Sequence, residues 1–235
     1  FIKRFELMKN YQEFFEHLTS TYLPVSKNDR TNTYGYIWET KVGAWFLKND
    51  HQWKTQFKHE TIMSPQKWGY GIESSKTRKV MWKDLGIDLV AEDHDGNMWG
   101  IQAKCYTVDI PSTEIDKFLG AMGATFFNFN NPKITKTFYK GLLLITNNIS
   151  DNARSKLKSW KTTNGSNRIV EVGPTYFKGS ELNWDDSINE TSTKSVYKKK
   201  CPLPHQKEAL GKIKKRWKHN DRGKCIMACG TGKTL

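Results

Sequence analysis

The chain has 235 residues, with 38 Lys and Arg against 24 Asp and Glu, and a formal net charge of +14 at pH 7. This balance favours a polyanionic partner, most naturally nucleic acid, and nine Trp with twelve Phe argue against a disordered chain. No stretch resembles a membrane span or a signal peptide, and four cysteines do not suggest a disulfide framework, so we expect a cytoplasmic protein with no membrane partner.

The N-terminal part is predicted to be helical. Apolar residues recur at helical spacing over 1–18 and again from about Thr33 to Leu47. Glu39 lies off the apolar stripe of the second helix, and such a glutamate is either solvated or part of a site. Over 51–78, basic residues alternate with aromatic ones, which fits either a phosphate-contacting surface or ordinary solvent cover.

The stretch 82–106 is predicted to form a β-hairpin. Two runs alternate between apolar and polar residues, and Asp95-Gly96 supplies a turn between them. A plain two-residue turn would set Asp88 opposite Ala103 and mix polar with apolar side chains on each face. Shifting the register by one residue, with a bulged or three-residue loop, matches apolar to apolar instead.

The shifted register brings Asp88 onto the same face as Gln102 and Lys104. This trio suits phosphodiester cleavage, because a carboxylate and neighbouring oxygens can hold Mg²⁺, which polarises the phosphate and acidifies a bound water. A lysine can stabilise the negative charge that develops at the phosphate. The alternative is a solvated hairpin face that carries ordinary polar residues, since short motifs also arise by chance.

Helices and strands alternate after the hairpin. A helix with Ser112 as its N-cap is followed by an apolar strand, a second helix and a further strand, over about 112–124, 138–146, 149–160 and 168–172. Ser150 or Asp151 is expected to cap the second of these helices. The order predicts an α/β domain built on a mixed sheet.

The composition changes at Asp185, and the polar run to Lys200 is expected to be an exposed linker between a domain over 1–184 and a segment over 201–235. That segment contains a short strand that leads into a phosphate-binding loop. Glycine N–H groups would face a phosphate, Lys233 would supply charge and Thr234 would hold Mg²⁺. The loop residues are Gly230, Gly232, Lys233 and Thr234.

The hairpin carries a resemblance to a known family. Gly86-Ile87-Asp88-Leu89 followed by Gln102-Ala103-Lys104 resembles the Mrr-like branch of the PD-(D/E)xK nucleases, which reads G-x-D, a turn and Q-x-K. The similarity extends over roughly 34–184. It implies a restriction-endonuclease-like mixed sheet flanked by helices, with Lys104 as transition-state stabiliser. It also implies a Mg²⁺ site formed by Asp88, Gln102 and the carbonyl of Ala103, in which Glu39 completes the metal site or positions a water.

The C-terminal loop resembles that of superfamily 2 helicases and translocases, although Met227 stands where the first Gly of G-x₄-G-K-[ST] would be. Gln206 is similar to the glutamine that contacts adenine in these motors. The resemblance implies the beginning of a RecA-like ATPase domain that uses ATP when complete. The acids and second lobe of such a motor are not among these residues, so we expect a truncated motor.

A Mrr-like nuclease followed by a motor resembles the N-terminal part of ATP-dependent restriction enzymes, most closely the single-polypeptide type ISP enzymes, with type I subunits also possible. This implies double-stranded DNA as partner, together with the rest of the polypeptide (motor, methyltransferase and target-recognition domains) or partner restriction subunits, in a bacterial or phage protein. Two alternatives stay open: a DNA-binding module with an inactive nuclease, and a motor-related fragment that only grips DNA.

Overall fold

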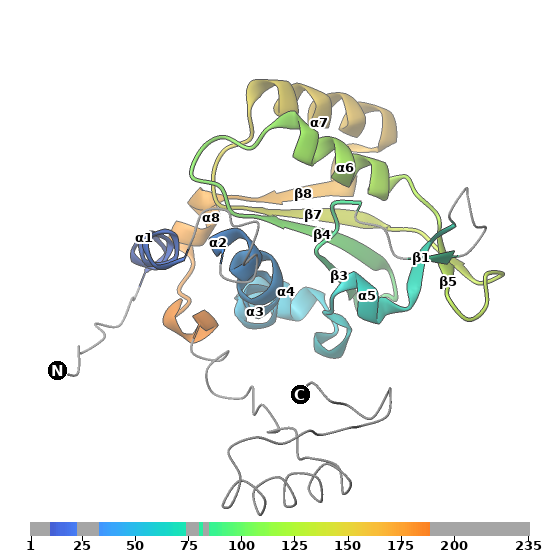
Figure 1. Cartoon of the computed structure of the whole chain (residues 1–235), viewed down its shortest axis with the longest axis horizontal. Helices are drawn as coiled ribbons and strands as arrows, with labels where there is room; N and C mark the ends of the chain where they lie inside the picture. Colours follow the sequence, from blue (N-terminus) through green and yellow to red (C-terminus); the bar gives the residue numbers. More distant parts are fainter. Residues whose placement is uncertain (1–9, 23–32, 74–79, 82–84, 189–235) are drawn as a thin grey trace, which may run out of the picture. The chain divides into compact units, whose positions relative to one another are not determined.

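A four-stranded mixed sheet lies between two helical layers in the computed structural model (Figure 1). The structure describes residues 10–22, 33–73, 80–81 and 85–188. The strand order is β3-β4-β7-β8, with β3 and β4 antiparallel and the other two pairs parallel. The strands are Leu89–Glu92, Met98–Lys104, Lys140–Ile145 and Ile169–Val172. The predicted mixed α/β architecture is therefore confirmed for this part of the chain.

The hairpin β3–β4 has the shifted register. Leu89 pairs with Ile101 and Ala91 with Trp99, so apolar residues face apolar ones. The Asp93 N–H donates to the Asn97 carbonyl at 3.0 Å, which leaves a three-residue loop that ends at Gly96, whose φ is +85°. Glycine adopts this left-handed conformation without a steric penalty. The prediction that the turn is not a plain two-residue type is confirmed.

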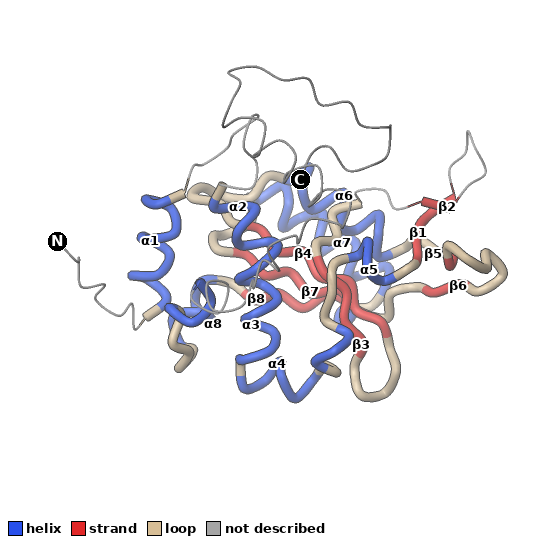
Figure 2. The backbone as a smooth tube through the Cα atoms, turned by 60° about the horizontal axis from the view of Figure 1, so that its bottom comes forward, coloured by secondary structure: helices blue, strands red, loops and turns tan. Residues whose placement is uncertain are grey.

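One face of the sheet is covered by an aromatic layer. It is formed by α1, α2, the π-helical turn η2, α3, α4 and α8, with bounds Tyr11–Thr21, Tyr34–Ile37, Trp38–Val42, Gly43–Asn49, His51–Gln56 and Pro174–Gly179. Trp38, Phe177 and Trp184 are fully buried at its centre. Figure 2 shows α2 and α3 crossing in front of the strands. The helix predicted over 33–47 is thus present, with a π-helical turn inside it.

Two helices cover the opposite face (Figure 1). They are α6, Ser112–Met122, and α7, Asp151–Asn164. The apolar stripe of α6 faces the core and includes Ile115, Phe118 and Met122. The stripe of α7 faces the same core and includes Ala153 and Leu157. Burial of each large apolar side chain contributes about 1.5–3 kcal/mol, so these stripes hold the layer in place.

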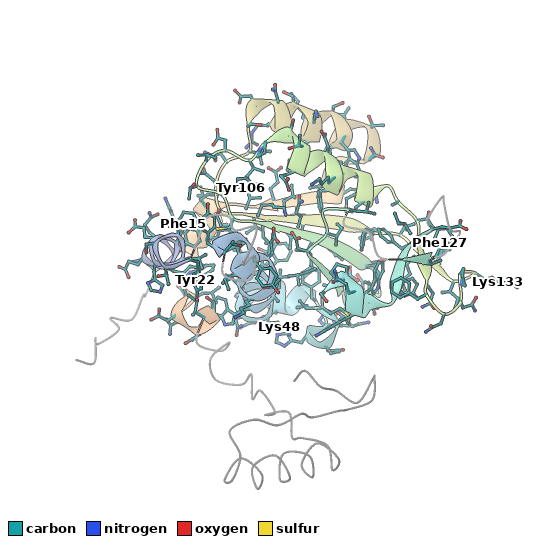
Figure 3. All side chains as sticks on the ribbon, viewed as in Figure 1. Phe15, Tyr22, Lys48, Tyr106, Phe127 and Lys133 are labelled. Carbon is teal, nitrogen blue, oxygen red and sulfur yellow. The ribbon has the colours of Figure 1, made fainter. Side chains whose placement is uncertain are left out.

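A smaller antiparallel sheet, β2-β1-β5-β6, and several short helices complete the described part. Figure 3 shows Phe127 and Lys133 of the β5–β6 hairpin at one end of the molecule, and Tyr106, just after β4, toward the other. The remaining bounds are β1 Tyr70–Glu73, β2 Val80–Met81, β5 Phe126–Asn128, β6 Thr135–Lys136, η3 His59–Thr61, α5 Pro65–Trp68 and η4 Ser166–Arg168.

Several sequence-based boundaries are corrected. Within the described residues, α1 begins at Tyr11, because the side chain of Asn10 caps the Glu13 N–H at 3.0 Å. Ser112 is the first helical residue rather than the N-cap, since Pro111 holds the extended cap position. The cap of α7 is Ser150, whose hydroxyl accepts from the Ala153 N–H.

The nuclease-like unit also extends further than expected. The residues 185–188 are helical, and Asp185 and Ser187 are buried next to Trp184. The chain divides into compact units at Phe1–Asn189 and Glu190–Leu235, so an exposed linker does not begin at Asp185. The aromatic residues Trp53 and Phe57 pack in the core, which removes them from the suggested phosphate-contacting surface over 51–78.

Candidate active site

The first component of the site is the Asp88 carboxylate, which is fixed at the open end of the hairpin. Asp88 directly precedes β3, and its N–H donates to the Ile101 carbonyl at 2.8 Å. Its Oδ2 accepts from the Ala103 N–H at 2.9 Å. Just before β3 begins, the Asp88 carboxylate therefore accepts the hydrogen bond that a backbone carbonyl would accept within the sheet. This hydrogen bond fixes the orientation of the carboxylate.

The second component is the Lys104 ammonium at the end of β4. Its Nζ lies 2.8 Å from Glu39 Oε1, 3.6 Å from Asp88 Oδ2 and 3.7 Å from Glu114 Oε2. The lysine side chain is only 12% exposed. Lys104 and Glu39, which are 65 positions apart in the chain, thus form a partly buried contact.

Glu39 reaches this point from the π-helical turn η2. The turn is anchored over the sheet by Trp38, whose indole Nε1 donates to the Leu144 carbonyl at 3.4 Å. A Cβ on Gly43, just after the turn, would lie 3.3 Å from Ala103 Cβ, so the turn packs closely against β4 at this point. The extra residue of a π-turn shifts the side chains that follow, and such turns often occur at functional sites.

The charges around Lys104 are unbalanced. Burial of the ammonium would lower the pKa of Lys104, but the carboxylates of Asp88, Glu39 and Glu114 more than offset it and raise that pKa above its ordinary value. Lys104 is therefore protonated at neutral pH. The three carboxylates outnumber the ammoniums of Lys104 and of Lys117, which lies 3.8 Å from Glu114 Oε1, and the remaining negative charge favours a further cation.

Gln102 contributes a side-chain amide whose nitrogen is hydrogen-bonded and whose oxygen is not. The side chain is fully buried, and its Nε2 donates to the Glu114 carbonyl at 3.4 Å. Its Oε1 is buried and has no hydrogen-bond partner in the described part of the chain. Leaving a buried acceptor unpaired costs about 1–3 kcal/mol. A ligand that accepts a lone pair from Oε1, such as a cation, would remove this cost.

The residues present fit a hard divalent cation as a mixed ligand set. Carboxylate, amide and carbonyl oxygens are the ligands that Mg²⁺ prefers, and Asp88, Glu39 and Gln102 Oε1 supply the first two kinds. The Ala103 carbonyl faces the Asp88 side of β4, because its N–H does so. Among the residues that the structure describes, no three His, Cys, Asp or Glu side chains could hold a metal by themselves.

The structure thus brings Asp88, Glu39, Gln102 and Lys104 to one end of the hairpin, and it adds Glu114 and Tyr106. Sequence analysis missed Glu114, because a glutamate in the first turn of a helix is usually a solvated residue that complements the helix dipole. Burial, followed by the charge of Glu114, raises the pKa of Tyr106. The residues expected to bind ATP lie outside the described residues: the adenine-contacting Gln206 and the phosphate-loop residues Gly230, Gly232, Lys233 and Thr234.

Comparisons with known proteins identify the family of the chain. The model of the Mrr_cat_2 family, described as "Restriction endonuclease", matches residues 48–194. No curated protein matches the chain. Within the described residues, no helix is long and apolar enough to cross a membrane.

One solved structure is similar over most of the chain. It is described as "ATP-dependent Type ISP restriction-modification enzyme LlaBIII bound to DNA". The sequence identity is 22% and the TM-score is 0.45. The similarity covers 93% of this chain and 12% of the other, so this chain spans about an eighth of the length of the protein it resembles.

Proposed function

Because the chain belongs to the restriction endonuclease family, whose model matches residues 48–194, we propose that the unit containing β3 and β4 is a Mg²⁺-dependent endonuclease that cleaves phosphodiester bonds of double-stranded DNA. Membership of the family implies nuclease activity. The proposal adds the residues: Asp88, Glu39, Gln102 Oε1 and the Ala103 carbonyl hold the metal, and Lys104 acts on the phosphate.

The observation that carries this proposal is the convergence of Asp88, Glu39 and Lys104 at the end of β4. A bound divalent cation would polarise the scissile phosphate and make a water nucleophilic near neutral pH. Asp88 and Glu39 would supply the carboxylate ligands of this cation. Lys104 places a positive charge where negative charge develops on the phosphate. The carboxylates of Asp88, Glu39 and Glu114 raise the pKa of Lys104, so the side chain carries the positive charge that this role needs.

We further propose that this unit operates within a larger ATP-dependent restriction enzyme. The phosphate loop at Gly230, Gly232, Lys233 and Thr234, with Gln206, supports a superfamily 2 translocase that continues beyond these residues. In this arrangement the partners are double-stranded DNA and the remaining domains or subunits. The net charge of +14 fits contact with the DNA backbone.

A second candidate is a DNA-binding module with an inactive nuclease. It is favoured by one observation: the Lys104 ammonium already contacts the carboxylates of Asp88, Glu39 and Glu114. Gln102 also supplies one negative charge fewer than the acid usual in the superfamily, which weakens attraction for a metal.

Plasmid cleavage by the 235-residue chain in Mg²⁺ or Mn²⁺, with EDTA as the blank, separates the two. We expect cleavage that Asp88→Ala and Lys104→Ala each reduce about a thousandfold, because roughly 4 kcal/mol of charge stabilisation is lost. Lys104→Arg should be partly active, since its planar fork differs from a point charge.

Glu92→Ala is the matched control, because it removes a carboxylate at the opposite end of the same hairpin, where Glu92 pairs with Lys58. It should cleave normally. DNA binding without cleavage by the unaltered chain would favour the inactive module. An Asp88→Ala variant that cut at the original rate would show that the metal role given to Asp88 is wrong.

A further inference from the structure

Glu114 contacts two of the site residues at once. Its Oε2 lies 3.7 Å from Lys104 Nζ, and its backbone carbonyl accepts from Gln102 Nε2 at 3.4 Å. The other oxygen, Oε1, lies 3.8 Å from the Nζ of Lys117, which is 56% exposed. Glu114, at the start of α6, therefore contacts both Lys104 and Gln102 of the Q-x-K segment.

The body of α6 keeps Glu114 from moving away. Ile115 and Phe118 are fully buried, and a Cβ on Gly141 of β7 would lie 2.6 Å from Phe118 Cζ. On the other side, a Cβ on Gly86 would lie 3.0 Å from Lys117 Cβ. The approach at Gly141 leaves no room for a side chain, and Gly86 adds a φ of +77° that favours glycine, so α6 lies close to the sheet at both points.

Asp88 and Glu39, the other two carboxylates near Lys104, are also the proposed metal ligands. Under the proposed function, Asp88 and Glu39 turn their oxygens to the metal, and these oxygens then interact less with the Lys104 ammonium. Lys104 Nζ is closest to Glu39 Oε1, so it would lose its shortest contact. Glu114 is not among the proposed metal ligands, and its contact with Lys104 would persist.

We propose that Glu114 is a positioning residue that holds Lys104 in place when Asp88 and Glu39 bind the metal, while its backbone carbonyl fixes the Gln102 amide with Oε1 as its free atom. This inference rests on the proposed function. It assigns separate roles to the three carboxylates: Asp88 and Glu39 bind the cation, and Glu114 binds the lysine. A misplaced ammonium stabilises charge poorly, so Glu114 would affect the chemical step more than binding.

The first test is steady-state cleavage by Glu114→Gln, which removes the charge and keeps the shape and the backbone. We expect kcat to fall about tenfold, while KM for DNA and the Mg²⁺ concentration for half-maximal rate stay within about twofold. Glu114→Asp should recover part of the rate. Asp116→Asn is the matched control, because Asp116 is an exposed carboxylate on the same helix that pairs with Lys156, and it should leave kcat unchanged.

Other outcomes of this test overturn the proposal. A tenfold or larger rise in the half-maximal Mg²⁺ concentration would make Glu114 a metal ligand. A fall in Tm with kcat unchanged for the folded fraction would make its role structural. Lys117→Ala should leave kcat unchanged, and a loss equal to that of Glu114→Gln would assign the effect to Lys117.

The second test does not require cleavage. The side-chain ammonium of Lys104 is followed by ¹H–¹⁵N NMR of the full chain in Ca²⁺, with the signal assigned by Lys104→Arg. We expect a resolved signal in the unaltered chain and in Asp116→Asn, and its loss through faster exchange in Glu114→Gln. A signal that persists in Glu114→Gln would refute the positioning role. If the unaltered chain does not cleave DNA at all, the proposed function fails, and this measurement still decides whether Glu114 holds Lys104.

Discussion

The Gln102 side chain is buried in the sheet, and its amide has one group that is paired and one that is not. A glutamate at this position would match the acid that is usual in the superfamily. It could not donate to the Glu114 carbonyl, however, and it would add a fourth carboxylate near Asp88, Glu39 and Glu114. The local environment therefore suits a neutral amide, whose Oε1 has no hydrogen-bond partner within the described residues.

Gln102→Glu should accordingly lose about 2–3 kcal/mol of unfolding free energy in the absence of divalent metal, because a buried donor bond is lost and a buried charge is added. Addition of Mg²⁺ or Mn²⁺ should restore part of the loss, since the new carboxylate attracts the cation. Thermal unfolding with and without metal measures both effects. Equal Tm values in EDTA for the variant and the unaltered chain would contradict the conclusion that the surroundings of residue 102 suit a neutral amide.

At the scale of the element, the hairpin loop is organised around the Asp93 carboxylate. It accepts from the Asn97 N–H at 2.8 Å, from the Asp95 N–H at 3.1 Å and from the Trp99 indole at 3.0 Å. Burial alone would raise the pKa of Asp93, but the hydrogen bonds from Trp99 and Asn97 lower it below its usual value. This loop fixes the register that places Asp88 beside the end of β4.

Asp93→Asn should lower stability by about 1–3 kcal/mol at pH 7, because an amide NH₂ would face the Trp99 donor. A carboxyl whose folded pKa is lowered contributes stability above its unfolded pKa of about 3.9 and loses it as pH falls through the folded value. The stability difference from the unaltered chain should therefore be full above about pH 5 and shrink at lower pH.

Denaturant titrations between pH 3 and pH 7 give this difference directly. Asp95→Asn is the control, because no hydrogen bond to the Asp95 side chain occurs within the described loop, and it should stay within about 0.5 kcal/mol at every pH. A pH-independent loss in Asp93→Asn would show that the carboxylate charge is not what the loop uses.

The loop before β3 is a second element on which the site depends. Gly86 has φ +77°, and a Cβ there would lie 3.0 Å from Gln102 Nε2. Gly96 in the hairpin loop has φ +85°, but nothing lies within 4 Å of its Cβ position. The two glycines thus share the same backbone strain on substitution and differ in what an added methyl group would contact.

Alanine substitutions at these two positions separate the two effects. Gly96→Ala should cost about 1 kcal/mol through its left-handed backbone and leave cleavage unchanged. Gly86→Ala should cost about 1–3 kcal/mol more, because it crowds the Gln102 amide, and it should also reduce cleavage. Unfolding curves and plasmid assays on both variants test this. Identical behaviour of the two would mean that Gly86 serves the turn and not the site.

At the scale of the whole molecule, two helical layers hold the sheet so that η2 and α6 approach the same end of β4 from opposite faces. Under the proposed function, the residues after the nuclease unit belong to a motor with a phosphate loop of its own. We therefore expect substitutions to separate DNA cleavage from ATP hydrolysis.

Lys233→Ala should leave the metal-dependent cleavage by the 235-residue chain unchanged, and this chain should bind ATP weakly or not at all. In a polypeptide that continues through a complete motor, the same substitution should stop ATP hydrolysis and, with it, DNA cleavage, because this lysine is proposed to contact the β- and γ-phosphates. Parallel ATPase and cleavage assays measure both. Normal cleavage by the longer Lys233→Ala protein would show that the nuclease acts independently of the motor.

The sequence by itself determined the features that depend on short-range pattern. Alternation with a period of two predicted the hairpin register, and so the common face of Asp88, Gln102 and Lys104, because a shift of one residue would mix polar with apolar side chains on each face. Helical spacing predicted the helix of Glu39 and the apolar face of α6. The boundaries at Ser112 and Asp185 were wrong, since caps and the packing of Trp184 depend on neighbours that no local pattern reveals.

Only the tertiary structure decided which charged groups meet. Glu114 resembles any acidic residue in the first turn of a helix, and its place beside Lys104 follows from the close approach of α6 at Gly86 and Gly141. The π-turn that directs Glu39 toward β4 likewise follows from packing over Ala103. Hydrophobic periodicity records which face of an element is buried, whereas the charges at the ends of elements are brought together by how those buried faces pack.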